Sequence, residues 1–80
     1  MSEHPAEVVA DCLYLAADLA PPDARPSSTW ALIRDATKDT AVRTRMLDAV
    51  AVTGLRDTAR LTLQVAADRI VCSILESENA

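Results

Sequence analysis

Side chains suited to catalysis or metal binding are few in this chain, and they are scattered. His4 is the only histidine, and no serine or cysteine is placed beside it to build a catalytic triad or a metal cluster. Cys12 and Cys72 lie sixty residues apart, which is not a metal-ligand spacing. Paired carboxylates would need a concave pocket, and a small bundle rarely provides one. We therefore expect no enzyme activity, no catalytic or metal-binding residue and no cofactor.

Three carboxylates near the N-terminus follow one another at helical spacing. They are Glu7, Asp11 and Asp18, and Tyr14 lies between them. A calcium ion needs a loop that surrounds it with oxygen atoms, and the straight face of a helix does not do this. The favoured interpretation is a solvent-exposed acidic stripe, and docking to a basic partner is the next alternative.

The composition predicts an all-α fold. Half of the eighty residues are hydrophobic, but Trp30 and Tyr14 are the only aromatic residues. The scarcity of aromatic side chains argues against a sheet, and the long segments consist largely of residues that favour helices. The whole chain, residues 1–80, is expected to form one domain. A core of this size rarely supplies more than about 3 to 5 kcal/mol of net stability without a disulfide, a metal or a partner.

Helical periodicity, prolines and capping residues predict the ends of four helices. Pro5 suits the first turn of a helix with Ser2 or His4 as its cap, and Asp39 or Thr40 can cap a later one. Gly54 suits the left-handed position that ends a helix. The expected compact four-helix bundle has helices over residues 5–20, 29–38, 40–53 and 55–76, with a proline-rich connection over 21–28. Ser27 or Ser28 is expected to cap the second of these helices. The middle two helices could also form a single bent helix.

The first helix is expected to be amphipathic. The residues predicted to share its buried face are Val8, Val9, Cys12, Leu13, Leu15, Ala16 and Leu19. Cys12 on this face, and Cys72 on an apolar face of the last helix, are both predicted to be buried thiols that react slowly.

The last helix carries apolar side chains on two faces. At about 100° per residue, one stripe contains Leu55, Ala59, Leu63, Ala66, Ala67, Ile70 and Ile74. A nearly opposite stripe contains Leu61, Val65 and Cys72, with Val71 and Leu75 beside it and a partly polar gap at Arg60, Gln64 and Asp68. A helix at the surface of a domain buries one stripe, so this helix is central, self-associating, or both.

The second stripe predicts a homodimer interface. The interface residues are expected to be Leu61, Val65, Val71, Cys72, Leu75 and Trp30. Trp30 has another interpretation, because a tryptophan just inside a helix start can anchor the preceding connection onto the bundle. A core or anchor role for Trp30 is favoured over the interface role.

The segments 40–53 and 55–76, which flank Gly54, also invite comparison with a helix-turn-helix. Its recognition helix would present Arg56, Thr58 and Arg60 to the major groove of DNA. Val50 and Arg60 stand where that motif usually has a small and an apolar residue, and the chain is acidic. A small DNA-binding transcriptional regulator is therefore the alternative and not the leading hypothesis.

Net charge and hydropathy limit the classes of partner that the chain is expected to bind. A net charge of −4 works against binding to nucleic acid or to an anionic membrane. Neighbouring acidic residues are expected to neutralise much of the one basic segment, which contains Arg34, Lys38, Arg43 and Arg45. No segment is long and apolar enough to span a bilayer, and the N-terminus does not look like a signal peptide, so we expect a cytoplasmic location.

Seven arginines to one lysine, with abundant alanine, is a composition typical of GC-rich coding sequence, which indicates a bacterium or its phage. The leading hypothesis is a small non-enzymatic protein-interaction module of adaptor, inhibitor or assembly-factor type. It would bind itself and another protein, and no small-molecule substrate is evident.

Overall fold

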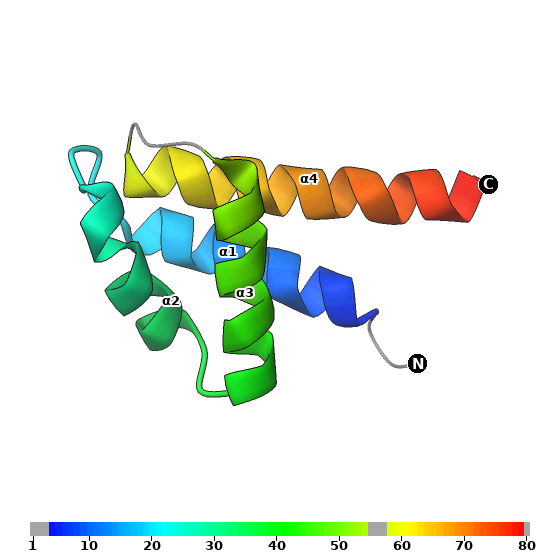
Figure 1. Cartoon of the computed structure of the whole chain (residues 1–80), viewed down its shortest axis with the longest axis horizontal. Coiled ribbons are helices and arrows are strands. Elements are labelled where there is room, and N and C mark those ends of the chain that lie inside the picture. The colour runs from blue at the N-terminus through cyan, green and yellow to red at the C-terminus, as the bar shows by residue number, and fades with distance from the viewer. Residues whose placement is uncertain (1–3, 55–57, 80) are drawn as a thin grey trace.

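Residues 4–54 and 58–79 are described by a computed structural model of the chain (Figure 1). Four α-helices and one short 3-10 turn make up the regular structure of these residues. In chain order they are α1 (Pro5–Leu19), η1 (Pro26–Ser28), α2 (Thr29–Ala36), α3 (Thr40–Thr53) and α4 (Ala59–Asn79). The predicted all-α, four-helix bundle is confirmed.

Side chains cap the first turns of α1 and α3, as the sequence predicted. His4 precedes α1, and its Nδ1 accepts a hydrogen bond from the Ala6 N–H at 3.1 Å. Asp39 precedes α3, and its carboxylate accepts hydrogen bonds from the N–H groups of Ala41 and Val42 at 2.9 and 3.2 Å. These bonds satisfy backbone donors that have no partner within the helix, and they fix where each helix begins.

The ends of the helices are partly as predicted. Gly54 closes α3 with φ 69°, which is the left-handed conformation expected for it. Thr37 is extended, with φ −145° and ψ 143°, so α2 ends at Ala36 instead of residue 38 and is separate from α3. Ser28 takes the cap position of α2, but its hydroxyl makes no capping bond, because its backbone is already helical at the end of η1.

The last helix differs from its predicted limits of 55–76. Its predicted first residues, 55–57, lie outside the described part of the chain. From Ala59 the helix continues to Asn79, three residues beyond the predicted end. Thr58 caps it, because its Oγ1 accepts a hydrogen bond from the Leu61 N–H at 3.1 Å.

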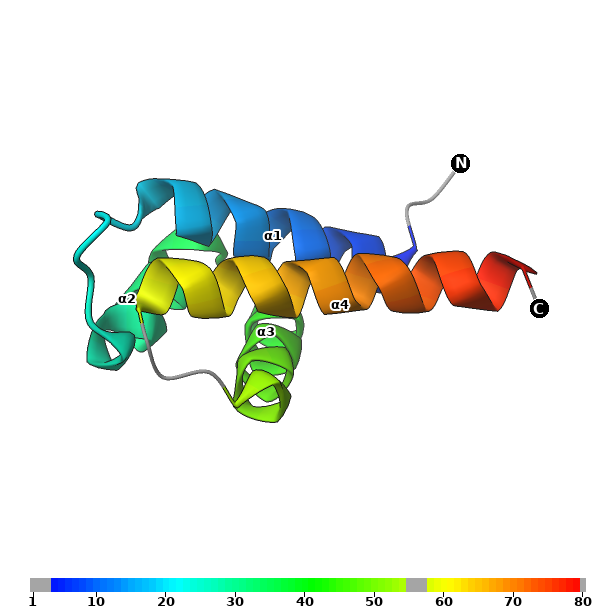
Figure 2. The same cartoon turned by 90° about the horizontal axis from the view of Figure 1, so that it is seen from above.

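The two longest helices, α1 and α4, lie side by side and run in opposite directions, and α3 crosses them steeply (Figures 1 and 2). α2 lies at the end of the bundle where α1 ends and α4 begins. There the Ala24 carbonyl accepts a hydrogen bond from the Ala59 N–H at 3.2 Å, and Ala20 is buried beside both residues. Alanines therefore hold the proline-rich connection against the bundle.

Each helix contributes one large side chain that is fully buried in the centre of the bundle. The four are Leu13, Ile33, Met46 and Leu63. Around them, the core contains buried alanines on both α1 and α4, including Ala17 on α1 and Ala67 on α4. The distance between packed helices depends on the side chains at their contact, so alanines allow a close approach.

The buried alanines of α1 show that its predicted buried face is wrong in part. Leu15 and Leu19 were expected inside, but they are 48% and 56% exposed. Ala10 and Ala17 are buried in their place. The helix is thus rotated about its axis so that its small residues meet α4, and two of its leucines face solvent.

Candidate functional site

The outer face of α4 carries apolar side chains that are exposed or half-buried. Leu61 and Leu75 are 40% and 53% exposed, Cys72 is exposed, and Val65 and Val71 are half-buried. The opposite face of the same helix is buried at Ala59, Leu63, Ala66, Ala67 and Ile74. The structure therefore confirms that α4 has two apolar faces, and its neighbours in the chain cover only one.

The spacing of the outer residues forms a regular seam. Leu61, Val65, Asp68, Cys72 and Leu75 follow one another at alternating steps of four and three residues. A repeat of this kind keeps side chains in line along one side of a helix, which is the arrangement through which two helices pack in a coiled coil. We call these five residues, together with the adjacent Val71, the α4 seam.

Asp68 interrupts the α4 seam with a carboxylate, and α1 supplies its partner. The hydroxyl of Tyr14 donates a hydrogen bond to Asp68 Oδ1. This hydrogen bond raises the pKa of the Tyr14 hydroxyl above its ordinary value, and partial burial and the negative charge of Asp68 raise that pKa further. The carboxylate is thus held at the junction of the two helices, with one of its oxygen atoms satisfied.

The two thiols do not occupy equivalent positions, and the prediction that both are buried is wrong for Cys72. Cys72 is exposed because it lies on the α4 seam, which no other helix covers. Cys12 is half-buried, and both thiols are free. Burial raises the pKa of the Cys12 thiol, the carboxylates of Asp11 and Asp39 add to that increase, and a hydrogen bond with Thr37 partly offsets it.

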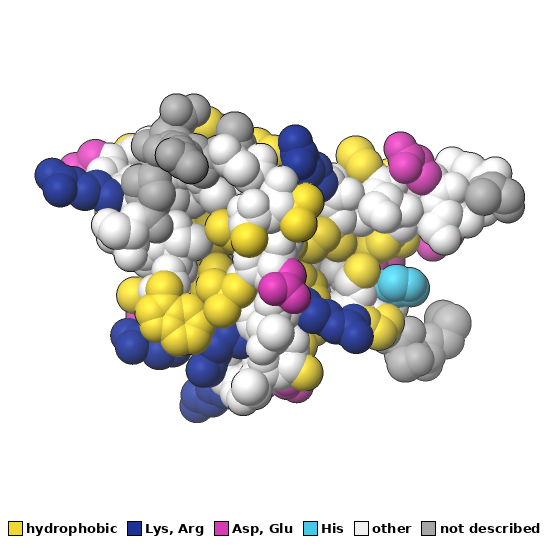
Figure 3. Space-filling model, in the orientation of Figure 1, with side chains coloured by type: hydrophobic (Ala, Val, Ile, Leu, Met, Phe, Trp, Pro, Cys, Tyr) yellow, Lys and Arg dark blue, Asp and Glu magenta, His cyan; other side chains and the backbone are white. Residues whose placement is uncertain are grey.

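Trp30 belongs to a different surface from the α4 seam. Its side chain is 47% exposed, and its ring faces the guanidinium of Arg43 on α3, whose carbon is 5.9 Å from the ring centroid. Arg43 also donates a hydrogen bond to the Thr37 carbonyl at 3.1 Å. Figure 3 shows hydrophobic side chains over α2 with basic side chains beside them. The structure therefore does not bring Trp30 together with the other predicted interface residues, and it does not place Trp30 in the core.

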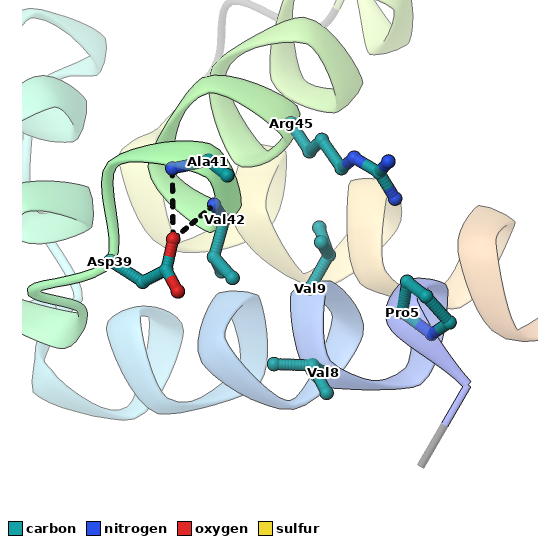
Figure 4. Close-up of a pocket in the computed structure, with 7 residues that line it drawn as sticks. All are labelled: Pro5, Val8, Val9, Asp39, Ala41, Val42 and Arg45. Atoms are coloured by element: carbon teal, nitrogen blue, oxygen red, sulfur yellow. Dashed lines mark hydrogen bonds between the residues drawn. The ribbon is translucent and has the colours of Figure 1, made fainter. Parts of the chain in front are cut away.

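The basic segment is divided among different local environments. Arg34 forms an ion pair with Asp35 at 3.8 Å, the one ion pair within the described residues. Lys38 is exposed. Arg45 lies at the rim of a groove of about 390 Å³ between α1 and α3 (Figure 4). The other residues that line this groove are Pro5, Val8, Val9, Asp39, Ala41 and Val42.

This groove offers little for chemistry. Its walls are mostly apolar, and the Asp39 carboxylate is already engaged in capping α3. Arg45 is the charged group left to meet a ligand. Across residues 4–54 and 58–79, no three histidine, cysteine, aspartate or glutamate side chains lie close enough together to hold a metal ion.

The residues of the helix-turn-helix alternative are only partly described. Arg56 lies outside the described residues. The Thr58 hydroxyl is engaged as the cap of α4, and Arg60 is half-buried. None of the described helices combines the length and the apolar character needed to cross a bilayer.

Comparison of the chain with protein-family models, with curated proteins and with solved structures finds no match.

Proposed function

We propose that the chain is a non-catalytic protein-interaction module that forms a homodimer through the α4 seam. The observation that carries this proposal is the exposure of Leu61 and Leu75 on a helix whose opposite face is already buried. Exposed apolar side chains aligned along one side of a helix indicate a binding surface, whereas single exposed residues do not.

The charges along α4 favour a second copy as the occupant of the seam. Arg60 and Arg69 alternate with Glu76 and with Asp68 of the seam itself, so the described charged side chains on and beside the seam have both signs. Two such faces do not repel each other as two faces of one sign would. A buried seam would also add to the thin core of an eighty-residue domain.

As an adaptor, inhibitor or assembly factor of a bacterium or phage, the dimer would act in the cytoplasm by presenting its remaining surfaces to another protein. Both thiols would stay reduced in that compartment.

The test is the mass of the protein in solution over a dilution series, by light scattering or sedimentation. We expect a dimer at high micromolar concentration that dissociates on dilution. Leu61→Glu and Leu75→Glu should each yield a monomer, because a charge placed in a dry interface loses its hydration without gaining a partner.

Val52→Glu is the matched control, because Val52 is 77% exposed on α3, away from the seam. This variant should keep the mass of the parent protein. A mass of 8.6 kDa at high micromolar concentration would reject the dimer, and loss of the dimer in Val52→Glu would place the interface elsewhere.

A further inference from the structure

The exposed face of α1 combines apolar and acidic side chains in a way that the α4 seam does not. Leu15 and Leu19 are about half exposed, and Asp11 and Asp18 are exposed. α1 also carries Glu7 and contains no lysine or arginine. Figure 2 shows α1 along one edge of the molecule. Its outer face is therefore open to a partner.

Helical spacing places these side chains together. Leu15 follows Asp11 by four residues and precedes Asp18 by three, so both carboxylates lie next to it on the helix surface. Leu19 follows Leu15 by four residues and extends the apolar strip by one turn. Leu15 and Leu19, together with Asp11 and Asp18, form what we call the α1 face.

The negative charge of the α1 face determines which kind of partner it can bind. A second copy would bring the same carboxylates together, and like charges in contact oppose association. An anionic membrane is disfavoured for the same reason. A basic helix, in contrast, offers cations to Asp11 and Asp18 while its apolar side lies over the leucines, as in the recognition of amphipathic helices by apolar grooves.

We propose that the α1 face docks a basic amphipathic helix of a partner protein. Leucine-sized side chains of the partner would cover Leu15 and Leu19, and its lysine or arginine side chains would pair with Asp11 and Asp18. This inference rests on the proposed role of the chain as an interaction module, but it does not depend on the dimer.

The experiment titrates the full chain with a designed peptide of about five helical turns. The peptide has leucine on one face and lysine on the other, and a matched peptide carries glutamate in place of each lysine. Amide chemical shifts report the site, and fluorescence anisotropy reports the affinity. We expect the lysine peptide to bind at α1 with an affinity that falls as salt rises, and the glutamate peptide not to bind.

Two double variants test the named side chains. Leu15→Ala with Leu19→Ala should weaken binding by more than about tenfold, because the apolar contact is lost. Asp11→Asn with Asp18→Asn should weaken it by about tenfold, the effect of two partly exposed charge pairs. Asp48→Asn is the matched control, since Asp48 is an exposed carboxylate on α3, and it should bind as the parent chain does.

Binding that is unchanged in both double variants, or equal for the two peptides, would overturn the proposal. If the parent chain is a dimer, a monomeric mass for Leu15→Glu would also overturn it, because the α1 face would then be covered by a second copy. A monomeric mass for the parent chain at high micromolar concentration, with peptide binding retained, would instead reject the dimer and leave this inference standing.

Discussion

The hydroxyl of Tyr14 on α1 donates a hydrogen bond to the carboxylate of Asp68 on α4, which lies 54 residues later in the chain. This bond joins the two longest helices where the acidic stripe of α1 meets the α4 seam. It leaves the negative charge of Asp68 in place but satisfies one of its oxygen atoms. A carboxylate held in this way costs less to cover with a partner than one whose hydrogen bonds to water must all be lost.

Tyr14→Phe removes this hydrogen bond and little else. We expect the free energy of unfolding to fall by about 0.5 to 1.5 kcal/mol, toward the low end because the pair lies near solvent. Urea unfolding followed by circular dichroism measures the change. Asp68→Asn is the control that keeps an acceptor for the hydroxyl while removing the charge. A Tyr14→Phe variant as stable as the parent chain would show that the hydrogen bond contributes nothing to the free energy of unfolding.

The same bond predicts a dependence on pH. The pKa of Tyr14 is raised in the folded chain, so the unfolded chain, with a pKa near 10.0, loses this proton first as pH rises. The stability from this group is therefore fully present below about pH 10 and is lost as pH rises through the folded pKa. The parent chain should lose more stability than Tyr14→Phe in this range. Tyr14 is the only tyrosine, so phenolate absorbance reports its titration directly.

Features that depend on neighbouring residues alone could be predicted from the sequence. Asp39 caps α3 and Gly54 ends it, because a side chain that bonds the next turn and a residue free to take positive φ act locally. The buried stripe of α4 was also predictable, since large side chains such as Leu63 and Ile74 mark it.

Features decided by the packing of one helix on another could not be predicted in this way. Periodicity favoured Leu15 inside α1, but the face of α1 that the other helices cover contains Ala17 and leaves Leu15 exposed. Cys72 looked buried because it shares a stripe with Leu61, and only the placement of the other helices shows that this stripe is uncovered. The position of Trp30 on a different surface from the α4 seam also depends on how the helices are placed relative to one another.

Leu63 and Leu61 lie two residues apart on α4, on opposite faces. Substitutions at the two positions should therefore distinguish an effect on folding from an effect on dimer formation. Leu63 is fully buried, so Leu63→Ala should cost about 2 to 5 kcal/mol of stability. Leu61→Ala should cost the monomer about 1 kcal/mol or less, but it should weaken the dimer. Thermal unfolding at low concentration and sedimentation at high concentration measure the two effects. Equal losses of stability in both variants at low concentration would contradict the assignment of the two faces.

Gly54→Ala tests the turn that ends α3. The position has φ 69°, and an added Cβ would lie 4.0 Å from the Val52 carbonyl oxygen, an ordinary van der Waals distance, so crowding contributes little. The expected loss of about 1 to 2 kcal/mol comes from the left-handed backbone conformation itself. Gly54→Asn should lose less, because asparagine tolerates this conformation better. A loss in Gly54→Asn as large as that in Gly54→Ala would contradict this explanation.

DNA binding is tested by gel shifts with mixed genomic DNA at low salt. The interaction-module proposal predicts no complex. A DNA reader would form one that weakens steeply as salt rises and depends on Arg56 and Arg60. A complex that Arg60→Ala abolishes, while Arg34→Ala leaves it intact, would establish the start of α4 as a nucleic-acid contact and reject the proposed function.

The two thiols provide a test of the α4 seam that needs no change to the seam itself. In dilute solution, Cys72 should react quickly with a thiol reagent because it is exposed, whereas Cys12 should react slowly because burial raises its pKa and lowers its thiolate fraction. At concentrations where the dimer forms, labelling of Cys72 should slow and that of Cys12 should not change. Cys12→Ser and Cys72→Ser assign each rate to its thiol, and denaturant should make the two rates similar. If the mass doubles with concentration while the Cys72 rate stays constant, the two copies associate through some other surface.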